Sequence, residues 1–229
     1  MSKSPATRTT FIDVGKRAAG PAGVTGVAII LLGMAISGVN YHVDTGRTYS
    51  VLNHFVSELG EVGVSHSAWA FNVGLIVGGL GILVFAVGLA LRIESWFRYL
   101  MLVLGIVTGG FGTLVGVFPT NIHRLHVLVA NGFFYPGLIT MTAFSLYTLV
   151  SRRHEFPRWI AIPGIVAAAG LFAFLFIAPG QTTTWHSLQG ERPAVWPLAA
   201  LEWVAIGAVL VWVAVVASII TIRDTRSTR

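Results

Sequence analysis

The sequence predicts an all-α integral membrane protein, a polytopic bundle of six transmembrane helices with a short amphipathic helix at its outer face. Two observations support this fold class. Of the 229 residues, 55% are hydrophobic and only 10% are charged, whereas about 25% of the residues in soluble domains are charged. The apolar residues also gather into six runs, each near or above the roughly 20 residues with which a helix crosses the hydrocarbon core.

The six apolar runs are joined by connections too short to hold a separate soluble domain. We expect transmembrane helices at residues 22–40, 69–91, 98–118, 125–150, 159–178 and 198–222. This domain, residues 22–222, follows an N-terminal tail of residues 1–21 and precedes a C-terminal tail of residues 223–229. The first run also has features of a cleavable signal peptide, but its apolar stretch is long for one, and we expect it to be retained.

Lysine and arginine are unequally distributed between the two ends of the predicted helices. Twelve lie at the end that carries both termini, and three, Arg47, Arg124 and Arg192, lie at the other. Because cytoplasmic flanks are enriched in these residues, both termini are expected to be cytoplasmic, with the protein in the cell membrane. The asymmetry also explains the net charge of +6, so we expect membrane lipids and no nucleic acid as partners.

Small and aromatic residues in the spans have structural interpretations. Glycines at spacings typical of close helix packing occur in the second and third spans; they are Gly74, Gly78, Gly81, Gly105, Gly109, Gly112 and Gly116. Tryptophans near span ends are interpreted as interfacial anchors; they are Trp96, Trp159, Trp196 and Trp203.

The outer end has six of the seven histidines. Its first connection, residues 41–68, is predicted to contain a helix near residues 49–60, because apolar residues recur there at helical spacing, at Leu52, Phe55, Val56 and Leu59. The opposite face of this helix is polar, with Asn53, His54, Ser57 and Glu58. Two placements remain open: an interfacial helix with a solvated polar face, or a lid over the bundle.

The second outer connection leads into the fourth span. Thr120 or Asn121 can cap that helix, and His123 and His126 project from its first turn at a spacing suited to two metal ligands. The helix dipole disfavours imidazolium there and keeps the rings neutral, available as ligands or bases. The same helix N-terminus, with Arg124, can also attract a phosphate.

Two further polar residues, Asn131 and Tyr135, follow Arg124 at helical spacing in the fourth span. This spacing suggests a polar track that leads into the bundle. The third outer connection adds His186, and the last span has Glu202 in its outer half. A carboxylate at membrane depth marks a functional site by default. The structural alternative for Glu202 is a buried hydrogen bond or ion pair.

The order of these motifs resembles a known family. The segment from Asn53 through Ser57 and Glu58 to Gly60 precedes the second span, and Phe118-Pro119 with His123 and His126 precedes the fourth. Together with six spans, this pattern is similar to the bacterial and archaeal membrane proteins of domain-of-unknown-function family 998. Members often have aspartate where this chain has Glu58. The resemblance implies the six-helix architecture and no particular activity.

Three functional hypotheses follow from the outer residues. The first is a binding site for lipid or a similar amphiphile, formed by Asn53, Arg124, Asn131 and Tyr135. The alternative is a zinc-dependent lipid hydrolase: its metal ligands would be His54, His123, His126 and His186, and its catalytic residues would be Ser57, Glu58 and Glu202. The third hypothesis is a proton-coupled transporter with Glu202 and histidines as a relay. The chain has no cysteine, so thiolate chemistry is excluded.

Overall fold

The computed structural model describes residues 10–41, 48–153, 155–177 and 192–227. Its α-helices are α1 (Phe11–Val39), α2 (Ala68–Leu91), α3 (Phe97–Val117), α4 (His123–Val150), α5 (Ala161–Phe172) and α6 (Pro197–Ser227). Shorter helical segments are η1 (Val56–Gly60), η2 (Thr120–Ile122), η3 (Arg158–Ile160) and the π-helical η4 (Ala173–Ile177). Six helical stretches are long and apolar enough to cross a membrane. The predicted fold class, a multi-pass membrane helix bundle, is confirmed.

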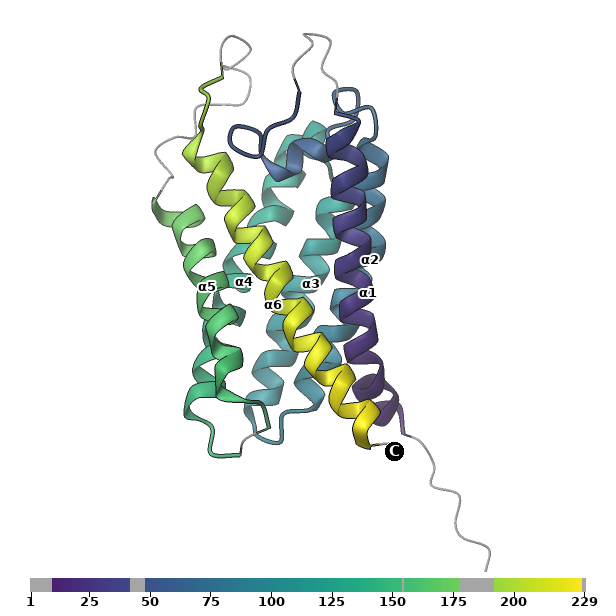
Figure 1. Cartoon of the computed structure of the whole chain (residues 1–229), viewed down its shortest axis with the longest axis vertical. Coiled ribbons are helices and arrows are strands. Elements are labelled where there is room, and N and C mark those ends of the chain that lie inside the picture. The colour runs from purple at the N-terminus through teal and green to yellow at the C-terminus, as the bar shows by residue number, and fades with distance from the viewer. Residues whose placement is uncertain (1–9, 42–47, 154, 178–191, 228–229) are drawn as a thin grey trace, which may run out of the picture.

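The six helices form a closed ring. Each packs against its neighbour in chain order, and α6 also packs against α1. In Figure 1, α6 runs obliquely from α5 at the top to α1 at the bottom. The start of α1 and the end of α6 therefore lie at one end of the bundle, named here the termini end. The opposite end, which carries η1, is named the η1 end.

Helix α1 is longer than its apolar run, and it begins inside the predicted N-terminal tail. The hydroxyl of Thr10 accepts a hydrogen bond from the Asp13 amide, and the Asp13 carboxylate accepts one from the Thr10 amide. This reciprocal capping satisfies amide groups that have no partner within the helix. Local capping, rather than apolar periodicity, thus determines where α1 begins.

The glycines of α2 and α3 are packing positions, in agreement with their spacing. A Cβ atom built on Gly78 would lie 2.6 Å from the carbonyl oxygen of Gly26 in α1. A Cβ on Gly116 of α3 would lie 2.5 Å from the carbonyl oxygen of Asn72 in α2. Such contacts leave no room for a side chain, so the glycines allow α1, α2 and α3 to approach closely.

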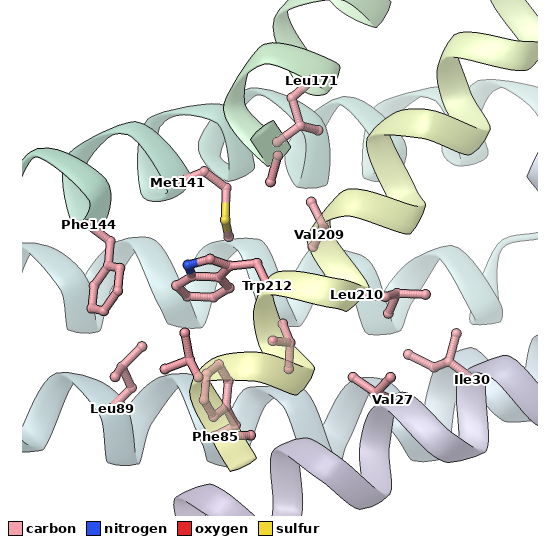
Figure 2. Packing of buried hydrophobic residues seen from close by; sticks show 14 of the residues in the cluster. Val27, Ile30, Phe85, Leu89, Met141, Phe144, Leu171, Val209, Leu210 and Trp212 are labelled. Carbon is pink, nitrogen blue, oxygen red and sulfur yellow. The ribbon is translucent and has the colours of Figure 1, made fainter. Parts of the chain in front are cut away.

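The core is centred on Trp212 of α6 (Figure 2). Its ring meets Phe85 of α2 and Phe144 of α4 edge to face, with centroids 5.9 and 5.2 Å apart. Edge-to-face contacts of this kind stabilise aromatic pairs beyond the burial of their area. Trp212 therefore links helices from both sides of the ring.

The predicted helix near residues 49–60 is shorter than expected and is not amphipathic. Only Val56–Gly60 is helical, as the 3-10 helix η1, and Val51–His54 form turns. Phe55, Val56 and Leu59 are buried as predicted, but Leu52 is 49% exposed. The polar residues His54, Ser57 and Glu58 are buried as well. Both faces of η1 are thus covered, which fits the lid placement and not a helix with a solvated polar face.

Candidate functional site

Two carboxylates satisfy the first amides of η1. Glu58 Oε1 accepts a hydrogen bond from the Phe55 amide at 2.8 Å, and Glu202 Oε2 accepts one from the Val56 amide at 2.6 Å. The amide groups at a helix start have no intrahelical partner, and negative charge near them is favourable. Glu58 is 1% exposed and Glu202 is 6% exposed, so both carboxylates are part of the interior.

Arg192 pairs with Glu58 through both of its terminal nitrogens. Arg192 Nη1 lies 3.0 Å from Glu58 Oε1, and Nη2 lies 2.8 Å from Oε2. Arg192 Nη1 also donates to the carbonyl of Asn53 at 3.1 Å. Burial alone would lower the pKa of Arg192, but the hydrogen bond and charge of Glu58 more than offset it and raise that pKa. This bidentate pair fixes the residues before α6 onto η1.

Aromatic side chains surround this ion pair. The Tyr41 hydroxyl donates to Glu58 Oε2 at 3.4 Å, and burial together with the Glu58 charge raises the pKa of Tyr41. The His54 ring lies 5.4 Å from the Tyr41 ring and 5.0 Å from the Tyr49 ring. Trp203 Nε1 donates to the His54 carbonyl at 3.1 Å. His54 is therefore enclosed by aromatic rings at the η1 end of the bundle.

The other end of η1 is attached to α1 and α2. Ser37 Oγ donates to the Leu59 carbonyl at 2.6 Å, and Asn72 Nδ2 donates to the Gly60 carbonyl at 2.9 Å. A Cβ atom on Gly60 would lie 2.3 Å from Asn72 Oδ1, so only glycine permits this approach. With Glu202 of α6 at its start, η1 is bound to three helices and closes the bundle between them.

A cavity of about 130 Å³ lies beneath η1, lined by residues of η1, α1, α2, α3, α4 and α6. Along α3 its lining extends from Met101 to Val115, which is about 21 Å of helix at 1.5 Å per residue. The cavity is therefore slender. Its lining is mostly apolar; besides Trp212 with its indole N–H, the polar side chains are Ser57, Thr108, His126, Thr140 and Glu202.

The polar side chains of the cavity fall into two sets. Thr108 and Thr140, in the middle of α3 and α4, lie within hydrogen-bonding distance of each other, 3.2 Å between their hydroxyls, and Thr140 also donates to the Pro136 carbonyl. Ser57, His126 and Glu202 belong to η1, the first turn of α4 and the second turn of α6. All three are therefore at the η1 end, and they give the cavity one polar end and one apolar end.

His126 has a defined tautomer. Its Nδ1 lies 2.8 Å from the Phe118 carbonyl oxygen, and a carbonyl oxygen can only accept a hydrogen bond. Nδ1 of the neutral ring therefore carries the proton, and Nε2 is a hydrogen-bond acceptor. His126 is buried and lines the cavity.

The proposed zinc ligands lie in different surroundings. His54 is enclosed by Tyr41 and Tyr49, His126 is bonded to Phe118, and His123 is exposed at the start of α4. Across the described ranges, no group of three or more histidines and carboxylates is placed to hold a metal ion. His186 lies outside the residues that the structure describes.

The predicted polar track along α4 does not enter the bundle. Arg124, Asn131 and Tyr135 share one face of the helix, as their spacing predicts, but all three are exposed. The inward face is the one that carries His126 and Phe134. Helical spacing specifies which residues share a face and does not specify which face is buried.

The predicted cap of α4 is also wrong. The Asn121 side chain does not bond to α4; its Oδ1 accepts from the Val62 amide and its Nδ2 donates to the Val62 carbonyl, both at 2.7 Å. Thr120 Oγ1 has no hydrogen bond within the described structure. Asn121 instead fastens the connection after η1 to the turn before α4. Asn53 has a comparable role, since its Nδ2 donates to the Pro193 carbonyl at 3.0 Å.

Several residues of the site have no marker in the sequence. Tyr41, Tyr49 and Trp203 surround the Glu58–Arg192 pair although nothing in their spacing indicates it. Trp196 is 6% exposed and packs on Phe55, so it is not an interfacial anchor. The sequence offered one signal for this part of the site: Arg192 is one of the three basic residues at this end.

Comparisons with curated proteins and with solved structures gave no match. A family match covers most of the chain, from within α1 to within α6, and agrees with the resemblance of the motifs around Glu58 and His126. The chain belongs to the family described as "Protein of unknown function (DUF998)", which matches residues 24–219.

Proposed function

We propose that this protein binds a lipid-like amphiphile inside the helix bundle. The hydrocarbon part occupies the cavity, and the polar part lies at the η1 end. The observation that supports this most directly is the asymmetry of the cavity, whose described lining is apolar over most of its length and polar at Ser57, His126 and Glu202. Ligand sites typically combine an apolar lining with a few polar groups that fix orientation.

The size and shape of the cavity suit a hydrocarbon chain. Its volume of about 130 Å³ is close to the roughly 150 Å³ of an engineered apolar cavity that binds benzene. A segment of about six carbons therefore fits without rearrangement. Because the cavity is slender and parallel to the helices, an extended chain fits it better than a compact polar metabolite.

The other hypotheses have less support. A zinc-dependent lipid hydrolase needs convergent ligands, and the described histidines are dispersed. A proton-coupled transporter needs a relay, and no hydrogen bond links Glu202 to a histidine among the described contacts. The basic residues support an outward-facing η1 end, so the polar part of the ligand would lie toward the outer side.

Photolabelling tests the proposal. The full chain in nanodiscs is incubated with hexadecanol that carries a diazirine in its alkyl chain, and labelled residues are mapped by mass spectrometry. We expect labels on cavity residues such as Met101 and Met141. Ala130→Leu, which fills the cavity, should reduce them, whereas the matched Ala28→Leu on an exposed face of α1 should not. Labels confined to exposed residues such as Ile139 would contradict the proposal.

A further inference from the structure

The polar end of the cavity contains hydrogen-bond acceptors and no cation. The residues that line the cavity, all of them described, include the carboxylate of Glu202 and no lysine or arginine. Ser57 and His126 line the same end, and His126 Nε2 is an acceptor because Nδ1 is committed to Phe118. The chemistry of this end is therefore that of an acceptor site with one carboxyl group and no basic side chain.

Glu202 has acceptor capacity that η1 does not use. Its carboxylate accepts from the Val56 amide. A carboxylate offers about four acceptor positions, so about three remain. Within the described residues, Glu202 forms no ion pair, although it is 6% exposed. A buried carboxylate without a counter-ion is costly, and a cation in the adjoining cavity would remove that cost.

The basic side chains described near this end are not available to an anionic ligand. Arg192 is held by both oxygens of Glu58 and by the Asn53 carbonyl. Arg124 is exposed on the outer face of α4 and does not line the cavity. A phosphate or carboxylate head placed beside Glu202 would therefore bring a second acidic group into a buried region without a basic partner.

We propose that the amphiphile carries a primary ammonium at its polar end, with Glu202 as its counter-ion; this inference rests on the proposed function. A primary ammonium has three N–H donors, which match the acceptors of Glu202, Ser57 and His126 at the polar end of the cavity. Hydrogen bonds between charged partners are roughly twice as strong as neutral ones. A hydroxyl head can use the same acceptors, but it binds more weakly because it brings no charge.

Competition at constant chain length tests the head group. Nanodiscs with the full chain and the photoactivatable hexadecanol receive dodecylammonium, dodecanol or dodecyl phosphate at equal mole fraction, and loss of cavity labelling is measured. We expect half-displacement by dodecylammonium at a concentration about tenfold or more below that for dodecyl phosphate, with dodecanol between them. Equal displacement by the phosphate would overturn the inference and leave the proposed function intact. Absence of cavity labelling by the probe itself would overturn the proposed function.

Variants test whether the Glu202 carboxylate causes the preference for an ammonium head. Glu202→Gln keeps the side-chain shape but removes the charge, and should reduce the ammonium preference to within about threefold. Glu61→Gln is the matched control, since Glu61 lies beside η1 but does not line the cavity, and it should keep the full preference. A Glu202→Gln variant that folds and keeps the full ammonium preference would overturn the role of Glu202. If Glu202→Gln does not fold, Ser57→Ala should weaken ammonium displacement severalfold, and no change in that variant would overturn the acceptor set.

Discussion

Each end of the bundle contains one arginine–carboxylate pair among the residues described, and the two pairs differ in burial. At the termini end, Arg92 pairs with Asp224, and their side chains are 21% and 32% exposed. At the η1 end, Arg192 pairs with Glu58, and the Glu58 side chain is 1% exposed. Both partners of the Arg92–Asp224 pair are in contact with solvent, whereas the carboxylate of the Arg192–Glu58 pair is buried.

The difference in burial accompanies a difference in role. Arg92 also donates to the Lys16 carbonyl, so its pair joins the ends of α1, α2 and α6 at the surface. Glu58 and Arg192 instead hold η1 above the cavity, where the carboxylate has no water to replace a lost partner. Similar ion pairs can therefore act as a surface tie at one end and as part of a closed interior at the other.

The largest expected difference between the two ends is their accessibility from outside the cell. The chain has no cysteine, so single-cysteine variants report on one position each. We expect an impermeant maleimide to label Val62→Cys, at an exposed position of the η1 end, and to leave Arg229→Cys unlabelled in intact cells. Labelling of Arg229→Cys would contradict the orientation inferred from the basic residues.

The same substitution at both arginines compares the two ion pairs directly. Arg192→Met leaves Glu58 buried without a counter-ion and should lower the free energy of unfolding by about 3–5 kcal/mol. Arg92→Met leaves Asp224 partly exposed and should cost at most about 1 kcal/mol. Unfolding in detergent measures both. Adding Glu58→Gln to Arg192→Met should recover part of the loss, and equal losses at the two ends would refute the distinction.

A smaller effect is expected from the contact between η1 and α2. In Gly60→Ala the new methyl group would meet Asn72 Oδ1 at 2.3 Å and the Phe71 ring at 2.8 Å. The displacement should lower the free energy of unfolding by about 1–3 kcal/mol. Gly207→Ala in α6 is the control, because nothing lies within 4 Å of its added Cβ. If the two variants are equally stable, η1 is held less tightly than the geometry indicates.

The six spans could be predicted because membrane insertion imposes long apolar runs that are visible locally. The ends of α2, α3 and α4 differ from the prediction by no more than two residues, because polar or turn-forming residues follow the apolar runs directly. Helix α1 starts earlier because its capping by Thr10 and Asp13 is independent of hydropathy. Apolar runs thus locate the spans, and capping decides where α1 begins.

The site could be predicted only in part, because its partners are distant in the sequence. Glu58 and Glu202 stood out as carboxylates in or near the membrane, but Arg192 lies 134 residues after Glu58, and Glu202 lies 146 residues after Val56. No local pattern signals such pairings. Whether the polar residues near η1 face water or the bundle stayed open, because local spacing cannot reveal the distant groups that satisfy them. For the same reason, the outward face of α4 was mistaken for the inward one.

The separation along the sequence between η1 and its partners determines when the η1 end of the bundle can be completed during synthesis. During synthesis from the N-terminus, the described spans α1 to α5 precede Arg192 and Glu202, the residues that bond to Glu58 and Val56 from the other side. Until α6 enters the membrane, the Glu58 carboxylate and the Val56 amide lack these partners. Helix α6 is therefore the one that closes the bundle, and a nascent chain that has not reached it still has its interior open at that end.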